Sequence, residues 1–309
     1  MKTIFMGTPD FSIDSLKYIY ENTDLKAVFT KVDKVNARGN KVNYSPVKQF
    51  ALEHNIDIVQ PRTLRNNEEV LEIIKKYDPE LIVVVAYGMI IPKEIIDYPK
   101  YGIINVHSSL LPKYRGAAPI HASILNGDDK TGVSIMYIDE KLDEGDVICS
   151  LETDITEEDN LGTLHDRLKI LGAKGLEQAI DLIKSGKVNA IKQDHSLATF
   201  VKPIKKEETK VDFKDSSRNI FNKIRGLNPF PEAYTILDGK VLKLYDSKIV
   251  EYSGNEVPGT VINLNKEGIL VKTGDGAILL KEVKLEGKRK QKALDFINGR
   301  QIEINKILE

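Results

Sequence analysis

The run Leu81-Ile82-Val83-Val84-Val85-Ala86 is apolar throughout and decides how the first half of the chain folds. A strand that is apolar on both faces is typical of the centre of a parallel sheet covered by helices. Further strand patterns lie at residues 3–6, 25–30, 102–107, 132–137 and 147–151. Helical patterns separate them, starting near Asp10 and at Ser45-Pro46 and spanning 67–76, 117–126 and 160–184. This alternation predicts an α/β fold with a doubly wound, mostly parallel, Rossmann-like sheet.

The pattern changes in the last third of the chain. Residues 187–205 show no clear periodicity and are expected to form a linker. A helical pattern at 216–225 then precedes strand patterns at 233–237, 240–249, 259–265, 268–273 and 277–285, and a last helix is predicted at 293–298. Short antiparallel strands at this spacing predict a small OB-like β-barrel. We therefore expect one domain at residues 1–186, the linker at 187–205 and a second domain at 206–309.

Composition limits the class of protein. A chain of 309 residues has room for two domains. Its formal net charge of −1 hides a mild asymmetry, because residues 206–309 carry +3 and residues 1–205 carry −4. The single cysteine, Cys149, excludes an intrachain disulfide framework and fits a reducing compartment. No apolar run approaches ~18 residues, so no membrane span is expected. The first residues lead straight into a strand pattern without a targeting peptide, so a cytoplasmic location is predicted.

Polar side chains capable of chemistry lie where strands end. Asn105 and His107 stand two residues apart at the end of a strand pattern, so both can point to the same face. Asp143 lies in an acidic loop between two later strands. A lone histidine is more often structural and an acidic loop is usually only solvated. An amide, an imidazole and a carboxylate at the carboxyl ends of strands nevertheless suit acyl transfer without a metal.

A metal site is not expected from these residues. The acids between 139 and 146 could in principle bind a hard cation, but the regular calcium-loop spacing is missing. The histidines and the cysteine do not have the spacing typical of zinc ligands either.

The motifs around these side chains resemble a known family. Asn105-x-His107, then Ser109-Leu110-Leu111-Pro112-x-Tyr114-Arg115-Gly116, then Asp143 in Leu-Asp-x-Gly-Asp resemble the catalytic core of the 10-formyltetrahydrofolate-dependent formyltransferases. This core is shared by enzymes that formylate different acceptors. The resemblance therefore implies 10-formyltetrahydrofolate as co-substrate, but the core alone does not identify the acceptor.

Three further features resemble the branch of the family that formylates methionyl initiator tRNA. They are the basic loop 31–44 with Arg38-Gly39-Asn40-Lys41, the segment Ile224-Arg225-Gly226-Leu227-Asn228-Pro229-Phe230-Pro231, and the end of the barrel with Gly287-Lys288-Arg289 and residues 293–299. The likeness spans essentially the whole chain. It departs at Phe230, where the family usually has Trp, at Glu232, where it usually has Gly, and in the loop, which lacks the family's prolines.

The resemblance implies a role for each group of residues. His107 and Asn105 would stabilise the oxyanion of the tetrahedral intermediate, and Asp143 would aid proton transfer. Folate would lie along Tyr87, Gly88, Met89, Ile90, Ser109, Leu110, Leu111, Pro112 and Asp139. The tRNA would contact Arg38, Lys41, Lys288, Arg289 and Lys290. The last three belong to residues 284–292, where five basic residues face one acid, although such a run is usually just a solvated loop.

Other functions remain open at this point. The core would also suit formyl transfer to a small amine such as an amino-sugar nucleotide, and a catalytically silent folate- or RNA-binding module could keep the same fold. The hydrolase part of a folate dehydrogenase would need further domains. We expect an enzyme that acts as a monomer, without a stable protein partner and without association with a membrane.

Overall fold

The computed structural model describes residues 1–35 and 42–309 of the chain. They form two compact units, each described by itself. The first unit contains Met1–Gly116, Thr131–Thr153 and His165–Val201, and the second contains Ala117–Lys130, Asp154–Leu164 and Lys202–Glu309. Two short segments from the middle of the chain therefore cluster with its last third. Within the described residues, no helix combines the length and the apolar character needed to cross a membrane.

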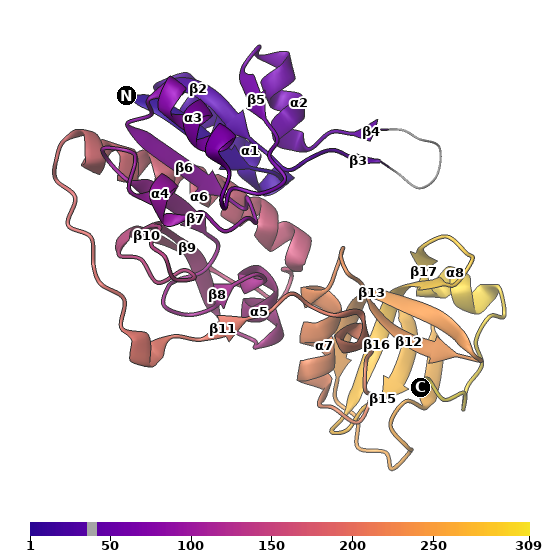
Figure 1. The fold of residues 1–309 in the computed structure, drawn as a ribbon. Coiled ribbons are helices and arrows are strands. Elements are labelled where there is room, and N and C mark those ends of the chain that lie inside the picture. Colours follow the sequence, from indigo (N-terminus) through magenta and orange to yellow (C-terminus); the bar gives the residue numbers. More distant parts are fainter. Residues whose placement is uncertain (36–41) are drawn as a thin grey trace. The chain divides into compact units, whose positions relative to one another are not determined.

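The first unit is built on a seven-stranded sheet with the order β10-β9-β7-β6-β1-β2-β5 (Figure 1). Its strands are β1 (Lys2–Gly7), β2 (Asp24–Phe29), β5 (Asp57–Val59), β6 (Leu81–Val85), β7 (Ile103–His107), β9 (Lys130–Tyr137) and β10 (Val147–Asp154). The pairs from β5 to β7 are parallel, whereas β7 and β9 are antiparallel. The predicted mostly parallel sheet is confirmed, and β6 lies near its centre, buried along its whole length.

The strand order reverses beside β1, because the chain goes from β1 outward to β2 and β5 and then returns to β6 and β7 on the other side. In open sheets of this kind ligands bind at the carboxyl ends of the strands, at the point of reversal. The loops that follow β1, β6 and β7 therefore lie at the edge where a site is expected.

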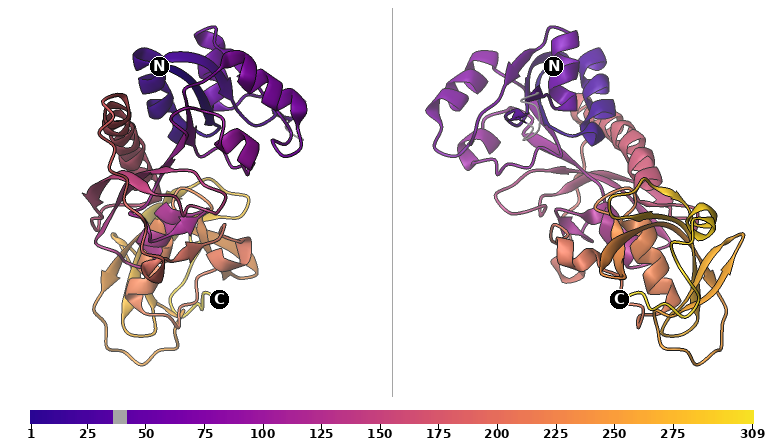
Figure 2. Two further views of the ribbon diagram at one scale, coloured as in Figure 1. Left: turned by 60° about the vertical axis from the view of Figure 1, so that its left-hand side comes forward. Right: turned by 90° about the vertical axis from the view of Figure 1, so that its right-hand side faces the viewer.

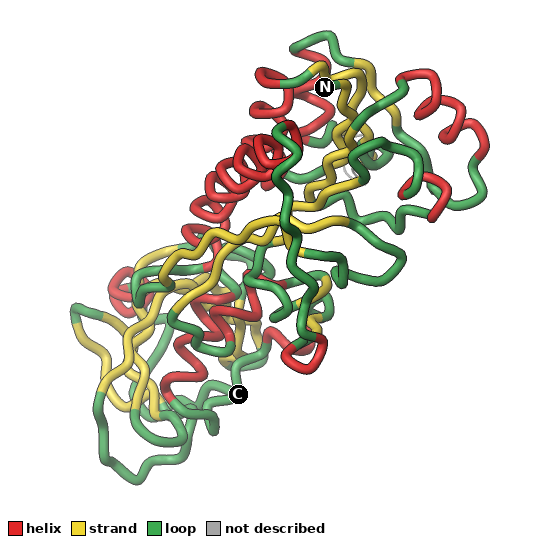
Figure 3. The backbone as a smooth tube through the Cα atoms, turned by 90° about the vertical axis from the view of Figure 1, so that its left-hand side faces the viewer, coloured by secondary structure: helices red, strands yellow, loops and turns green. Residues whose placement is uncertain are grey.

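Helices pack on both faces of this sheet. They are α1 (Ile13–Asn22), α2 (Pro46–Glu53), α3 (Glu68–Tyr77), α4 (Lys93–Ile96) and the long α6 (Leu161–Lys184), with the short turn η1 (Asp10–Ser12). A second short turn, η2 (His195–Leu197), has no buried residue. Val70 and Ile74 of α3 and Ile95 of α4 join the core on one face. On the other face α6 runs along the sheet (Figure 3), where its Gly172 lies against Val106 of β7.

Local chemistry explains where these helices start. The hydroxyl of Ser45 accepts a hydrogen bond from the backbone N–H of Lys48 at 3.1 Å, and Pro46 occupies the first position of α2. The side chain of Asn67 caps α3 in the same way. The predicted helices at 67–76, 117–126 and 160–184 appear as α3, as α5 (Pro119–Leu125) and as α6.

Three small elements complete the first unit. The strands β3 (Lys34–Val35) and β4 (Val42–Asn43) pair as a hairpin. The strands β8 (Arg115–Gly116) and β11 (Phe200–Val201) pair in parallel. Ile191 also forms a bridge with Val147. The segment after residue 186, which lacks periodicity in the sequence, is therefore held to this unit at two places.

The second unit contains an antiparallel sheet with the order β12-β13-β16-β15-β14, and β17 pairs with β16. Its elements are α5, η3 (Lys206–Thr209), α7 (Ser217–Gly226), β12 (Ala233–Leu237), β13 (Lys240–Val250), β14 (Val261–Asn265), β15 (Gly268–Lys272), β16 (Ala277–Leu285), β17 (Gln291–Lys292) and α8 (Ala293–Asn298). Ile220, Phe221 and Ile224 of α7 are buried with the apolar face of this sheet, and α8 packs beside β15 and β16 (Figure 2).

The predicted antiparallel second half is confirmed. Among the described strands, however, none of the pairings joins β12 to β14, so the sheet is open and a closed barrel is not found. The long β13 and β16 instead curve through irregular register near Asp246. Bulges of this kind bend strands and increase their twist without closing the sheet.

Candidate active site

His107 ends strand β7 and is almost fully buried, with 6% of its surface exposed. Its Nε2 atom lies 2.9 Å from the carbonyl oxygen of Tyr114. A carbonyl oxygen only accepts hydrogen bonds, so Nε2 must carry the hydrogen and donate it. This contact leaves Nδ1 as the ring nitrogen that can exchange a proton.

Asp143 faces that nitrogen. Its Oδ2 atom lies 3.7 Å from Nδ1 of His107 and accepts a hydrogen bond from the backbone N–H of Gly116 at 2.8 Å. The distance to the imidazole suits an ion pair but is too long for a direct hydrogen bond. Asp143 adopts a left-handed backbone with φ of 52°, which turns the loop sharply at this residue. The structure thus brings together two of the three predicted catalytic side chains.

Asn105, the third predicted catalytic residue, is half-buried in β7, between Val84 of β6 and Met136 of β9. It belongs to the same strand face as His107, because the two residues are separated by one position. Strands thus pair with this part of the backbone on both sides.

The predicted folate residues lie on two loops and one exposed turn. Tyr87 is buried, its hydroxyl has no hydrogen-bond partner among the described residues, and burial raises its pKa above the ordinary value. Gly88 follows with φ of 70° and Nζ of Lys31 close by, Met89 is half-buried, and Ile90 is 72% exposed.

The loop after β7 is held by serine hydroxyls. Ser109 Oγ donates to the carbonyl oxygen of Lys113, and Ser134 Oγ lies 2.8 Å from the carbonyl oxygen of Ser109 and 3.0 Å from the N–H of Leu111. Leu110, Leu111 and Pro112 are half-buried on this loop. Asp139 is exposed instead, and its carboxylate accepts from the N–H of Lys141, so it caps its own turn.

Sequence reasoning missed Gln193 and gave Arg115 no role beyond its place in a motif. Both are buried beside Asp143 and are hydrogen-bonded to each other. An arginine in a Gly/Pro-shaped loop next to candidate catalytic residues was a signal that could have been followed. Gln193 had none, because it lies in the segment without periodicity.

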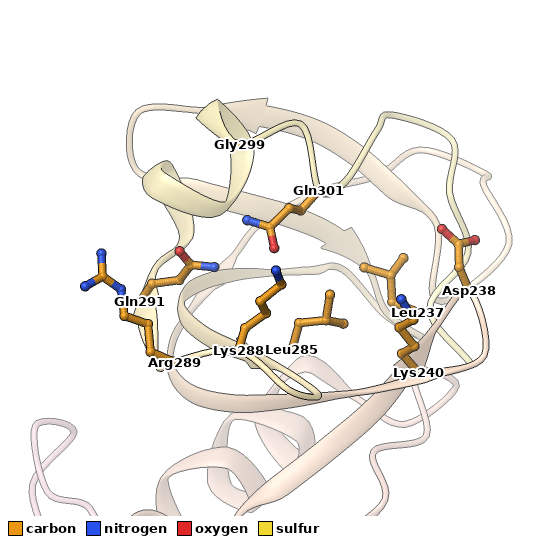
Figure 4. A pocket seen from close by; sticks show the side chains of 9 residues that line it. All are labelled: Leu237, Asp238, Lys240, Leu285, Lys288, Arg289, Gln291, Gly299 and Gln301. Carbon is orange, nitrogen blue, oxygen red and sulfur yellow. The ribbon is translucent and has the colours of Figure 1, made fainter.

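The predicted tRNA contacts divide into two places. Arg38 and Lys41 lie outside the described residues. Lys288 and Arg289 line a pocket of about 550 Å³ in the second unit, together with Leu237, Asp238, Lys240, Leu285, Gln291, Gly299 and Gln301 (Figure 4). Asp238, the acidic residue of this lining, is paired with Lys306 at 2.9 Å. Of the described acidic residues, none pairs within 4 Å with Lys240, Lys288 or Arg289, so their charge stays available to an anion.

Lys290 differs from its two neighbours. Its ammonium forms an ion pair with Glu282 at 2.8 Å and lies over the ring of Tyr245. It lines a second pocket of about 900 Å³ that also contains Arg225, Asp246 and Glu282. The structure therefore does not group Lys290 with Lys288 and Arg289.

One cluster among the described residues could hold a metal ion. It consists of Asp10, His165 and Asp166, whose ligand atoms lie within 4.8 Å of one another. Both carboxylates are exposed, and Asp10 already forms an ion pair with Lys169 at 2.8 Å. Exposed groups of this kind are common without an ion, and neither His107 nor Asp143 belongs to the cluster.

Comparison with known proteins defines the class. Residues 1–180 match the formyl transferase family and residues 203–301 match the formyl transferase C-terminal domain. The chain is 53% identical to a methionyl-tRNA formyltransferase of Fusobacterium nucleatum over 310 residues, which is all of both chains. It is 45% identical to that of Bacillus subtilis, over 99% of this chain and 97% of the relative. The chain therefore belongs to the formyl transferase family, and these full-length relatives are methionyl-tRNA formyltransferases.

Solved structures share the fold. A methionyl-tRNA formyltransferase from Clostridium thermocellum is 19% identical with a TM-score of 0.56, over 92% of this chain and 98% of that one. A sugar 3N-formyl transferase, WlaRD, solved with dTDP and 5-N-formyl-THF, is 23% identical with a TM-score of 0.68, over 94% and 99%. At these identities the likeness concerns the fold alone.

Proposed function

We propose that this chain transfers a formyl group from 10-formyltetrahydrofolate to the amino group of methionyl initiator tRNA, for translation initiation. The observation that carries the proposal is the pair formed by His107 and Asp143, in which Nδ1 of a buried imidazole faces a carboxylate at 3.7 Å. Full-length relatives at 42–53% identity that bear the methionyl-tRNA formyltransferase name support the choice of acceptor.

In the proposed reaction, the amine of the methionyl group attacks the formyl carbon on N10 of the folate. The tetrahedral intermediate carries an oxyanion and a cationic nitrogen. We assign Nδ1–H of protonated His107 and the side-chain amide of Asn105 as donors to the oxyanion, because Nε2 of His107 is already used by Tyr114. No covalent enzyme intermediate is needed, because the amine is already a nucleophile.

Asp143 would aid the proton transfers of the reaction. The attacking nitrogen must lose a proton and N10 must gain one before the C–N bond to the folate breaks. The carboxylate of Asp143, 3.7 Å from Nδ1 of His107, would stabilise the imidazolium of His107 and would pass this proton directly or through one water. Holding the two substrates in line would supply much of the remaining rate enhancement.

The folate is proposed to lie along Tyr87, Gly88, Met89, Ile90, Ser109, Leu110, Leu111, Pro112 and Asp139. Two of its supporting loops follow β6 and β7, on the side of the sheet where the strand order reverses. The buried hydroxyl of Tyr87 offers a hydrogen-bonding group that the described residues leave unused. The 5-N-formyl-THF present with the sugar 3N-formyl transferase is a ligand of the same class.

The tRNA is proposed to contact Arg38 and Lys41 at its acceptor end and Lys288, Arg289 and Lys290 in the second half of the chain. The uncompensated charges of Lys288 and Arg289 beside a pocket support phosphate contacts there.

We infer that the open antiparallel sheet serves as an OB-like platform for the RNA. We also propose residues 1–186 as the catalytic domain, 187–205 as a connecting segment and 206–309 as the tRNA-binding domain.

Formyl transfer to a small amine such as an amino-sugar nucleotide is the alternative. The fold alone permits it, since a sugar 3N-formyl transferase has a similar fold. The full-length relatives and the uncompensated basic pocket favour tRNA. A silent folate- or RNA-binding module is less well supported, because His107 and Asp143 face each other.

We further propose that the enzyme acts as a cytoplasmic monomer, without a metal, without a stable protein partner and without association with a membrane.

The experiment that tests the proposal is an assay of the purified chain with 10-formyltetrahydrofolate and charged initiator tRNA. We expect formylmethionyl-tRNA to accumulate, and we expect a charged elongator tRNA and an amino-sugar nucleotide to be poor acceptors. Efficient formylation of the sugar nucleotide without formylation of tRNA would establish the alternative. Folate binding with no transfer to either acceptor would establish the silent module.

A further inference from the structure

We propose that Gln193 and Arg115 are positioning residues that hold the loop around Asp143 against His107. The inference rests on the proposed function, because it concerns the same site. It assigns a role to a glutamine that lies 50 residues after Asp143 and outside every motif of the catalytic core.

The guanidinium of Arg115 is the centre of the network. Arg115 is only 1% exposed, and its Nε and Nη2 atoms donate to Oε1 of Gln193 at 3.1 and 2.8 Å. Its Nη1 lies 3.3 Å from the carboxylate of Glu144, the residue that follows Asp143. A buried charge is tolerated only when it is paired and hydrogen-bonded, so these contacts are needed to keep the guanidinium in place.

Gln193 connects the guanidinium to the backbone of the Asp143 loop. Its Nε2 atom donates to the carbonyl oxygens of Asp143, at 2.9 Å, and Gly145, at 2.7 Å. Only one orientation of the amide satisfies both sides, because its oxygen must face the arginine donors and its nitrogen the two carbonyls. No hydrophobic side chain can replace Gln193 here, because none both accepts and donates hydrogen bonds.

The hydrogen-bond network also includes both neighbours of Arg115 in the chain. The N–H of Gly116 donates to Oδ2 of Asp143, while the carbonyl oxygen of Tyr114 accepts from His107. One tripeptide therefore contacts both the imidazole and the carboxylate. Its position is fixed in turn by the N–H of Arg115, which donates to the carbonyl oxygen of Thr199 at 2.8 Å, and by the pairing of β8 with β11.

The consequence is that the backbone and the side chain of Asp143 are both held through Arg115. Without the amide of Gln193, two carbonyls and two guanidinium N–H groups would lose their partners in a buried place. The loop would shift to find water, and the carboxylate would move relative to Nδ1 of His107. A displacement near 1 Å in such a site can lower turnover about 100-fold.

The test uses two variants of Gln193 in the full-length chain. Gln193→Met removes both the amide oxygen and the amide nitrogen but keeps a side chain of similar size. Gln193→Glu keeps an acceptor for Arg115, but an ionised carboxylate cannot donate to the two carbonyls. For both we expect kcat for tRNA formylation to fall by about 10- to 100-fold, with KM for 10-formyltetrahydrofolate and for tRNA nearly unchanged. A folded Gln193→Glu variant with normal kcat would overturn the proposal.

A double-mutant cycle with Asp143→Asn separates positioning from general stability. If Gln193 acts through Asp143, Gln193→Glu should cost little more in the Asp143→Asn background than Asp143→Asn costs alone. Fully additive losses would show that Gln193 acts on something other than Asp143, and the proposal would be wrong.

Thr3→Val is the matched control. Thr3 is also a buried polar residue whose hydroxyl is hydrogen-bonded, to the hydroxyl of Thr23 at 2.7 Å, but it lies at the start of β1, away from the carboxyl ends of the strands where the proposed site lies. We expect it to lower Tm without lowering kcat. An equal fall in kcat would mean that any loss of a buried hydrogen bond has this effect. Failure of the proposed function itself would look different, because the unaltered chain would then be unable to formylate tRNA.

Discussion

At the scale of single residues, His107 is the side chain on which the proposed chemistry depends most. His107→Ala removes the donor to the oxyanion and the partner of Asp143, so we expect kcat to fall by roughly 100-fold or more. Single-turnover formylation of methionyl-tRNA would measure this, with circular dichroism to verify the fold. Unchanged turnover in a folded variant would exclude His107 from the mechanism.

Glu232 illustrates how one residue can replace another in an unfavourable backbone conformation. Its φ is 78°, a left-handed value that suits the glycine usual in the family at this position. Glu232 is held there by an ion pair with Lys243 and a hydrogen bond from the hydroxyl of Tyr245. Burial opposes ionisation, but these partners outweigh it and lower the pKa of the Glu232 carboxyl.

A pH dependence of stability follows. A lowered carboxyl pKa stabilises the folded state above the ordinary value of 4.5, and this contribution disappears as the pH falls through the lowered pKa. Glu232→Gln lacks the charge at every pH. We expect the variant to have a lower Tm than the unaltered chain at pH 7 and the difference in Tm to narrow as the pH falls below 4.5 and through the lowered pKa. A difference that is independent of pH would show that the charge of Glu232 does not contribute.

At the scale of elements, the turn between β9 and β10 has to place Asp143. Gly145 has no room for a side chain, because a Cβ atom there would lie 1.8 Å from the carbonyl oxygen of Tyr137. Gly145→Ala must therefore displace the backbone beside Asp143. We expect a loss of both Tm and kcat, measured by thermal unfolding and by the formylation assay.

Gly186 offers a matched control for this change. It also has a left-handed backbone, with φ of 66°, but a Cβ atom there would meet nothing within 4 Å. Gly186→Ala should cost about 1 kcal/mol of stability through backbone strain and leave kcat unchanged. If the two variants behaved alike, the close contact at Gly145 would not explain the effect.

At the scale of the whole molecule, binding of a polyanion should be dominated by charges that have no internal partner. Replacing Lys288 and Arg289 together by glutamine should weaken tRNA binding and reduce the slope of log K against log salt by about 2. Lys290→Gln should change the slope less, because Lys290 already pairs with Glu282. Filter binding at several salt concentrations would measure both. A slope change of about 1 for Lys290→Gln, as large per charge as that of the double variant, would show that the ion pair of Lys290 opens when tRNA binds.

The metal requirement is also a property of the whole molecule. In the proposed reaction the nucleophile is an amine and the oxyanion is stabilised by hydrogen bonds, so a chelator should leave turnover on methionyl-tRNA unchanged. Magnesium has to be kept as a control, because it also shapes the tRNA. Loss of activity that one added divalent ion restores would contradict this expectation and direct attention to Asp10, His165 and Asp166.

The sequence by itself determined the elements and their class. Leu81–Val85 is apolar because it lies inside a sheet covered on both faces, and the starts of α2 and α3 follow from their capping side chains. The short β5 was missed, because three residues carry too little pattern to predict a strand. The motif around His107 predicted that this residue lies at the end of a strand, and His107 does end β7.

Tertiary structure alone decided the contacts between distant residues. Nε2 of His107 is hydrogen-bonded to Tyr114, and Gln193 connects Arg115 to the loop of Asp143. Lys290 pairs with Glu282, unlike Lys288. No local periodicity relates the groups that these contacts join. Local pattern reports which face of an element is buried, because burial repeats with the period of the helix or strand. Pairing across a loop or between strands depends on the folded path of the whole chain. For that reason the motif could predict candidate catalytic residues at a strand end, while the contacts of Gln193 and Arg115 could not be predicted.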